Sequence, residues 1–189
     1  MKFKIRMKLL SDTIFGNGIS VPGGEDISIL HDENGFPYYK GGTLKGVFRE
    51  ELENYLRLTG EKDPEQKMAE LLGAPGDFEE SGARIYFSDL EIPKEVQKRI
   101  LSENLDPESV LDLFTDIRTF TALDDDGIAE TGSLRMARCA IKDISYVGEI
   151  ECECTKEDEK LITNTLKCIK WIGSMRNRGF GQVMITEVQ

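Results

Sequence analysis

After the first methionine the chain alternates strictly between charged and apolar side chains. In KFKIRMKL, residues 2–9, Lys or Arg occupies every second position and Phe, Ile, Met or Leu occupies the positions between them. A period of two is typical of a β-strand that has one face in a core and the other face open. The rest of the chain must therefore supply a layer for the apolar face, while the outer face is basic.

The patterns that follow predict further strands and helices. Apolar residues recur at helical spacing from Thr43, which can cap a helix that stops near Gly60, and residues 83–92 read as a second strand. Alternation returns in residues 145–154, and residues 182–188 form a last strand. Between these two strands, Thr155 and Asp158 are spaced as the capping box of a helix.

The order β–α–β–insert–β–α–β predicts an α+β fold. It is the order of a ferredoxin-like, RNA-recognition-type domain, in which an antiparallel sheet carries two helices on one face. We expect a single domain over residues 1–189, with its core in about residues 1–92 and 137–189. The insertion, about residues 93–136, begins with two short acidic helices, PKEVQKRILSEN and PESVLDLFTDI. An extended excursion over residues 119–140 follows them.

Charge is divided unevenly along the chain. The net charge is −11, but residues 50–130 hold 22 Asp and Glu against 8 Lys and Arg, and the remainder holds 13 against 16. An acidic insertion is thus carried on a mildly basic frame, which can meet a nucleic acid despite the acidic total. No run of apolar residues approaches a membrane span, and no apolar signal-peptide core follows MKFKIRMK, so we expect a cytoplasmic protein without a membrane partner.

Few side chains suit a resident metal or nucleophilic catalysis. The four cysteines, Cys139, Cys152, Cys154 and Cys168, lack ribbon or finger spacing, which favours free buried thiols over a metal site. The single histidine, His31, argues against a His-rich metal site and against a Ser/His/Asp triad. The sequence indicates no organic cofactor.

Two stretches combine glycine with basic side chains. WIGSMRNRGFGQVMI, residues 171–185, surrounds Arg176 and Arg178 with glycines that include Gly179 and Gly181, so a ligand can approach the backbone while the guanidinium groups meet phosphate. YYKGGTLKGVFRE, residues 38–50, places several candidate anion contacts at the start of a helix: Gly41, Gly42, Thr43, Lys45 and Arg49. The alternative is a glycine turn followed by a solvated basic helix face.

The loop GISVPGGEDISILHDENG carries the candidate carboxylates. Asp32, before Glu-Asn-Gly, suits a turn. Asp26 has no evident cap or turn role, and it is the better candidate for holding Mg²⁺ or poising a hydroxyl, with a solvated loop carboxylate as the alternative. The cluster DDDG lacks the EF-hand spacing and favours a charged turn over a cation site.

Three ordered blocks together carry a family resemblance. GGEDISILHDENGFPYYKGGTLKGVFREEL, LLGAPGDFEESGARIYFSDL and GSMRNRGFGQV resemble the RAMP superfamily of CRISPR-associated proteins, in particular the repeated backbone subunit of type III effector complexes. The resemblance implies a subunit that polymerises along a CRISPR guide RNA. It also implies that the helix start and the arginine–glycine loop grip the RNA backbone, with other effector subunits, further copies of the chain and target RNA as partners.

The resemblance also implies an activity in antiviral defence. Asp26 occupies the position of the family's cleaving aspartate, which makes the chain an endoribonuclease that cuts guide-paired target RNA with Mg²⁺, by attack of a 2′-hydroxyl on the neighbouring phosphate. The metal ligands are unknown. Residues 119–136 resemble the family's thumb, a hairpin that pushes between guide and target, with Ile128, Leu134 and Met136 as its apolar tip or, alternatively, as its anchor to the core.

Some positions depart from the family pattern and leave other functions open. Lys40 stands at a proline position, Gly42-Thr43 replaces a serine pair, and Glu25 makes the surroundings of Asp26 acidic. One alternative is a RAMP subunit that does not cleave, and another is a guide-processing endonuclease that uses His31. The third is a ferredoxin-like protein-interaction domain whose acidic surface binds basic partners.

Overall fold

The computed structural model describes every residue except 17, 19–23, 74–83, 123 and 189. It confirms an α+β fold with antiparallel sheets. The larger sheet is formed by β1 (Lys2–Leu9), β2 (Ile85–Phe87), β5 (Ser145–Cys152) and β6 (Val183–Val188), in the order β2-β5-β1-β6. Every neighbouring pair of strands is antiparallel, and β1 is central, because it pairs with both β5 and β6.

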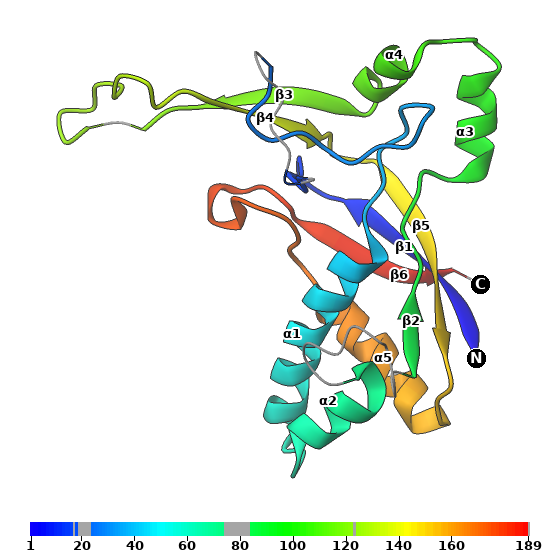
Figure 1. Ribbon diagram of the computed structural model, residues 1–189. Helices are drawn as coiled ribbons and strands as arrows, with labels where there is room; N and C mark the ends of the chain where they lie inside the picture. The colour runs from blue at the N-terminus through cyan, green and yellow to red at the C-terminus, as the bar shows by residue number, and fades with distance from the viewer. Residues whose placement is uncertain (17, 19–23, 74–83, 123, 189) are drawn as a thin grey trace.

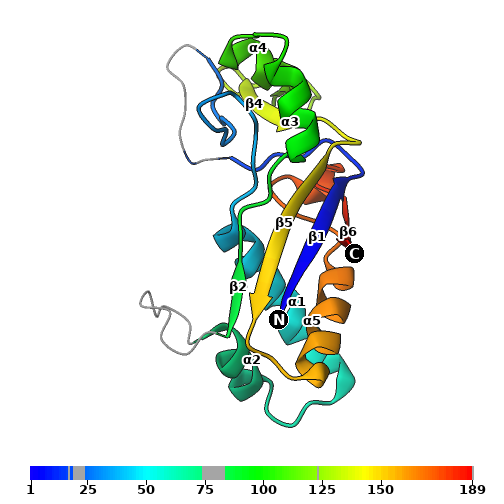
Figure 2. The same cartoon turned by 90° about the vertical axis from the view of Figure 1, so that its right-hand side faces the viewer.

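The alternation in residues 2–9 has the predicted consequence. Ile5, Met7 and Leu9 are buried, whereas Lys4 and Arg6 are exposed on the opposite face. Two helices, α1 (Gly41–Thr59) and α5 (Lys156–Cys168), lie on the same side of the sheet (Figures 1 and 2). They belong to the same core cluster as the apolar residues of β1.

Helix α1 begins three residues before the expected position. Lys40 is its N-cap residue and Gly41 its first residue, so Thr43 is not the cap. The Gly41 N–H donates instead to the carboxylate of Asp89, 48 residues away, at 2.8 Å. Gly60 ends the helix in a left-handed conformation, as predicted.

Strand β2 is shorter than the sequence predicted, and helix α2 is additional to the predicted elements. Strand β2 has three residues rather than ten, and beyond it the chain turns to pair Leu90 with Tyr39. Helix α2 (Pro64–Leu72) was not expected, although Asp63 caps it through its side chain and Pro64 opens its first turn. Both are common helix-start signals, so the sequence did contain the information.

The insertion folds as two short helices and a hairpin. Helices α3 (Lys94–Leu101) and α4 (Pro107–Asp112) are followed by β3 (Thr115–Phe120) and β4 (Arg135–Ala140), which form a separate two-stranded antiparallel sheet. Helix α4 ends sooner than the sequence suggested, because Thr115 already pairs with Ala140. Figure 1 shows this hairpin projecting away from the larger sheet.

The four cysteines are free thiols, as expected. Cys139 and Cys152 are buried and Cys154 is half-buried, but Cys168 is exposed, so the expectation of burial fails for one of them. Among the described residues, none of the helices has the length and apolar character needed to cross a membrane.

A buried carboxylate joins three elements beneath the sheet. Asp158, 2% exposed, forms the predicted capping box with Thr155 and accepts a hydrogen bond from Lys67 of α2 at 2.7 Å. The Arg84 guanidinium, next to β2, lies 3.6 Å from the same carboxylate. Burial by itself would raise the pKa of Asp158, but hydrogen bonds from Lys67 and Thr155 outweigh it and hold this pKa below its ordinary value.

We expect Asp158→Asn to lower the free energy of unfolding by about 2 kcal/mol, because it weakens both a helix cap and an ion pair. Since folding lowers the pKa of Asp158, its contribution is complete at neutral pH and is lost as the pH falls below about 4. Urea unfolding at pH 7 and pH 3 measures both effects. The exposed Glu157→Gln on the same turn is the control, and an equal loss for the two variants would contradict the role given to Asp158.

Candidate nucleic-acid interface

The arginine–glycine loop, residues 173–181, contains glycines of two kinds. A Cβ on Gly181 would lie 2.0 Å from the Ile172 carbonyl oxygen, and one on Gly173 would lie 2.2 Å from the Ile14 carbonyl oxygen. These two glycines are therefore required by the packing of the chain itself. Around Gly179, in contrast, a Cβ would meet no atom within 4 Å, so the outer side of the loop is open.

The two arginines of the loop stand in the short 3-10 turn Arg176–Arg178, and both are exposed. Neither forms an ion pair with a carboxylate in the described part of the chain. Burial raises the pKa of Tyr39 to about 12, and the positive charge of Arg176 opposes that rise. Arg178 instead lines a cavity of about 490 Å³ together with Asp12 and Lys142.

The glycines at the start of α1 are also of two kinds: one is required by the packing of the chain, and the others have open space beside them. A Cβ on Gly41 would lie 2.3 Å from the Phe87 carbonyl oxygen, and the Gly41 N–H is occupied by Asp89, so Gly41 serves packing. Gly42 has no atom within 4 Å of its Cβ position, and neither does Gly46, which was not singled out from the sequence. Glycine inside a helix is unfavourable, so two glycines with free space around them indicate room for a ligand.

The helix start and the arginine–glycine loop line one cavity. Lys40 and Thr43 line a cavity of about 180 Å³ together with Gly173 and Ser174. The hydroxyl of Tyr39, which also lines this cavity, is buried and has no hydrogen-bond partner among the described residues. A polar group in this position can bind water or a ligand oxygen.

The two basic residues further along α1 differ in their surroundings. Lys45 is half-buried and makes no ion pair within the described residues. The Arg49 guanidinium donates to the carbonyl oxygens of Leu72 and Gly73, at 3.3 and 3.0 Å, so it caps the C-terminal end of α2. Arg49 was expected to meet phosphate, and its role here is structural, which could not be foreseen without α2.

Asp26 is exposed and lies against the base of the hairpin. Its N–H donates to the Met136 carbonyl oxygen at 2.9 Å, and its Oδ2 accepts from the Met136 N–H at 2.8 Å. Oδ1 has no hydrogen-bond partner in the described part of the chain. Met136 therefore lies in β4, in the paired base of the hairpin, and of the two roles left open by the sequence this position favours the anchor over the tip.

The other two apolar candidates lie in the connection between β3 and β4, with Leu134 directly before Arg135, the first residue of β4. Ile128 is 64% exposed and Leu134 60% exposed. Within DDDG, the carboxylate of Asp124 accepts from the backbone N–H groups of Asp126 and Ile128, at 3.0 and 2.8 Å. This cluster forms a charged turn, as the sequence suggested.

Glu25 does not add its charge to the surroundings of Asp26. It is buried and forms an ion pair with Arg138 of β4. Burial alone would raise the pKa of Glu25, but hydrogen bonds from its own backbone N–H and from Arg138 outweigh it and hold the pKa below its ordinary value. The acidic surroundings that the sequence suggested are therefore neutralised.

The neighbouring His31 and Asp32 have local roles. The Nδ1–H of the exposed His31 donates to the Asp32 carbonyl oxygen at 2.9 Å. The Asp32 carboxylate accepts from the N–H groups of Asn34 and Phe36, both at 2.9 Å, which confirms it as a turn residue.

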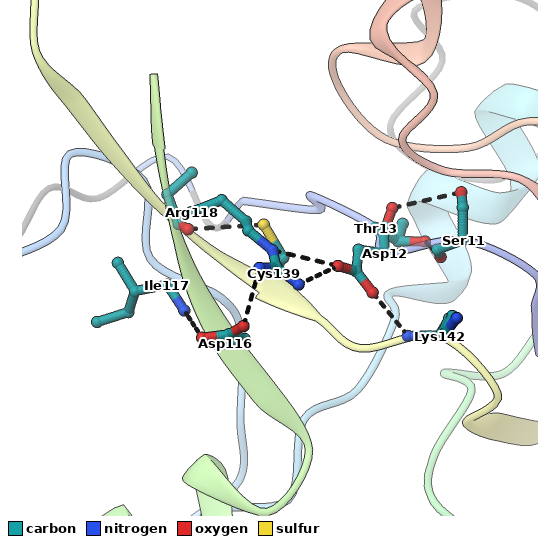
Figure 3. Close-up of polar contacts among 9 residues, drawn as sticks. Ser11, Asp12, Thr13, Asp116, Ile117, Arg118, Cys139 and Lys142 are labelled. Carbon is teal, nitrogen blue, oxygen red and sulfur yellow. Dashed lines mark hydrogen bonds and ion pairs between the residues drawn. The ribbon is translucent and has the colours of Figure 1, made fainter. Parts of the chain in front are cut away.

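One short segment connects the loop, the hairpin and Asp26. Ile14 pairs with Ser174 of the loop, Gly16 pairs with Ile29, and Ile27, next to Asp26, pairs with Ala137 of β4. Just before them, the Asp12 carboxylate accepts from the Arg118 guanidinium at 2.6 Å and from the Lys142 N–H at 3.0 Å (Figure 3). Segments far apart in the sequence are thus joined into one surface.

A divalent cation would find few protein ligands on this surface. Within the part of the chain that the structure describes, no group of three or more His, Cys, Asp or Glu side chains could hold a metal ion. Of the Asp26 carboxylate, Oδ1 has no hydrogen-bond partner among the described residues. Mg²⁺ commonly uses one or two carboxylates and takes its other ligands from water and phosphate, so Asp26 fits an ion shared with a nucleic acid.

Comparison with solved structures shows the same fold in known proteins. A chain in the cryo-EM structure of type III-B Cmr-beta bound to cognate target RNA has a TM-score of 0.72 and 13% identity, over 99% of this chain and 97% of that one. A chain in the cryo-EM structure of the apo state of type III-B Cmr-beta has a TM-score of 0.75 and 14% identity, over 100% and 98%. No curated protein sequence matches this chain significantly.

The family follows from a match of a different kind. The family model of the RAMP superfamily matches residues 6–184, which include the arginine–glycine loop, the start of α1, Asp26 and the hairpin. The match covers nearly the whole chain and agrees with the family resemblance of the sequence blocks. The chain is a member of the RAMP superfamily.

Proposed function

We propose that the chain is a backbone subunit of a type III CRISPR effector complex, which binds guide RNA and cleaves guide-paired target RNA. The observation that carries the proposal is the continuous surface in which residues 14–16 join the arginine–glycine loop to residues 25–29 and to the hairpin. A subunit of this kind needs its guide-binding groups and its cleaving carboxylate on one surface. Its antiviral role and its cytoplasmic location belong to the same proposal.

The fold supports this proposal at the level of architecture. The strand order β2-β5-β1-β6, with α1 and α5 on one face, is compatible with a ferredoxin-like core. The similar chains belong to type III-B Cmr-beta structures, one of which contains cognate target RNA. By analogy, the partners are guide RNA, target RNA, further copies of the chain and other effector subunits.

Guide RNA would lie along the open side of the loop and of α1. Arg176 and Arg178 would meet phosphates, while Gly42 and Gly179 leave space for the RNA backbone. The β3–β4 hairpin, with the exposed Ile128 and Leu134 in the connection between its strands, would act as the thumb that separates guide from target. Gly41 and Arg49 would contribute through the fold rather than through RNA contacts.

Cleavage would use a hydroxyl of the target RNA itself. Its 2′-oxygen attacks the neighbouring phosphorus, the bond to the 5′-oxygen breaks, and a cyclic phosphate and a 5′-hydroxyl result. The carboxylate of Asp26, held by Met136, would accept the proton of the 2′-hydroxyl or orient that group. Asp26 would also hold Mg²⁺, and when bound this ion would supply positive charge against the phosphate.

RNA affinity should depend on the two loop arginines. We expect Arg176→Ala with Arg178→Ala to weaken binding of labelled guide RNA, and to lower the slope of log affinity against log salt by about 0.7 for each lost phosphate contact. Fluorescence anisotropy over a salt series measures both quantities. The control is Lys156→Ala with Lys160→Ala on α5, which removes the same charge elsewhere, and equal losses would mean that only net charge matters.

Replacing Gly42 or Gly46 with alanine should affect stability and binding in opposite directions. The free chain should gain up to about 1 kcal/mol, because alanine favours the helix and the structure leaves room for its methyl group. Guide RNA should bind about tenfold more weakly if it lies against this face. Thermal unfolding and anisotropy test the two effects, with the exposed Asn54→Ala on the same helix as control; unchanged affinity would remove α1 from the RNA path.

Asp26→Asn tests the cleavage step in the assembled complex. The amide keeps the shape and an oxygen acceptor for Met136 but loses the charge, so target cleavage should fall by about 100-fold or more while guide binding is unchanged. Single-turnover cleavage of labelled target RNA is the measurement, and Glu33→Gln is the exposed control. Cleavage at the parent rate would remove Asp26 as the cleaving residue.

A further inference from the structure

Two ion pairs hold the β3–β4 hairpin against loops from the other end of the chain. On β3, Arg118 pairs with Asp12 at 2.6 Å (Figure 3). On β4, Arg138 pairs with Glu25, the residue immediately before Asp26. The two pairs are alike in chemistry, but only the second one adjoins the candidate cleaving residue.

Contacts to β4 hold the chain on both sides of Asp26. The N–H of Asp26 and the N–H of Ile27 both donate to the Met136 carbonyl oxygen, at 2.9 and 3.2 Å. The Arg138 N–H donates to the Ile27 carbonyl oxygen at 2.9 Å. These hydrogen bonds fix the backbone that follows Glu25, and the ion pair fixes Glu25 itself.

The side chain of Arg138 joins three elements at this point. Its Nε donates to Glu25, while one terminal nitrogen donates to Asp112 at 2.6 Å and to Thr115 Oγ1 at 3.1 Å. The Arg138 and Glu25 side chains are 12% and 11% exposed, against 62% for Asp112. Arginine keeps its charge at any ordinary pH, so the shielded pair with Glu25 is a lasting contact.

The orientation of the Glu25 side chain affects how easily a phosphate can reach Asp26. A free Glu25 carboxylate beside Asp26 would repel a phosphate from the position that Asp26 must reach. The pair with Arg138 turns this charge inward and neutralises it. It leaves the Oδ1 of Asp26 as the carboxylate oxygen without a described partner.

We propose that Arg138 is a positioning residue for Asp26: through Glu25 it fixes residues 25–27 to the thumb base and keeps a second negative charge away from the scissile phosphate. The inference rests on the proposed function, in which Asp26 acts in cleavage. It adds that the thumb and residues 25–27 move as one unit. A single subunit would then set the distance between the base pair that the thumb displaces and the bond that is cleaved with the help of Asp26.

The test compares Arg138→Gln with Arg118→Gln in the complex reconstituted with guide RNA. Each variant removes two ion pairs, those of Arg138 with Glu25 and Asp112 or those of Arg118 with Asp12 and Asp116, but only Arg138→Gln frees Glu25. We expect Arg138→Gln to slow single-turnover cleavage at saturating target by about tenfold to 100-fold, because a small misplacement of a catalytic group has effects of that size. The Kd of target RNA should stay within about twofold, and Arg118→Gln should cleave at the parent rate.

Two further variants guard against simple misfolding. Glu25→Gln keeps Arg138 with Asp112 and Thr115, so the hairpin retains most of its support. It should slow cleavage, but less than Arg138→Gln does, because it loosens the loop without leaving a free negative charge beside Asp26. Arg138→Lys keeps the charge but cannot bond all three partners, and it should recover part of the rate. Equal slowing by Arg118→Gln and Arg138→Gln would overturn the inference, since it would reflect a generally loosened hairpin.

Amide hydrogen exchange of residues 24–30 gives a reading that does not depend on cleavage. Arg138→Gln and Glu25→Gln should both speed exchange at Asp26 and Ile27, whose N–H groups donate to Met136, and Arg118→Gln should not. Unchanged exchange would overturn the positioning role even if cleavage slows. Faster exchange together with full cleavage by Asp26→Asn would mean instead that the loop is held as inferred and that the proposed active site is wrong.

Discussion

The geometry of the whole surface depends on how the chain continues beyond the central strand β1. Within a few residues of Leu9, the Asp12 carbonyl oxygen accepts from Gly181, Thr13 pairs with Ala140, and Ile14 pairs with Ser174. Strand β1 is itself held on both sides by antiparallel neighbours. A segment anchored so firmly at one end can act as a rigid spacer between the arginine–glycine loop and the hairpin.

Features that are set by neighbouring residues could be predicted from the sequence. The alternation of β1, the capping box of Thr155, the helix stop at Gly60 and the turn at Asp32 all follow from side chains within a few positions of one another. The family resemblance added the order of the blocks. Residue types alone brought Asp26 and the arginine–glycine loop forward as candidates, and the structure joins both to one surface.

Features that depend on distant residues could not be predicted in this way. The start of α1 is set by Asp89, the guanidinium of Arg49 is occupied by carbonyl groups at the end of α2, and Met136 is fixed by Asp26. In each case the sequence around one residue does not indicate which distant residue it will contact. A basic residue at helical spacing therefore predicts a charged face, and only the fold decides whether the charge is free for a ligand.

The open glycines of α1 have a thermodynamic consequence for the free subunit. Gly42 and Gly46 each lower the free energy of unfolding by up to about 1 kcal/mol relative to alanine. Among the described residues, no atom lies close enough to their Cβ positions to compensate for this loss. A ligand seated on this face would return stability to the fold through mass action. The subunit is then least stable when it is empty, so its lifetime in the cell would rise with the supply of guide RNA.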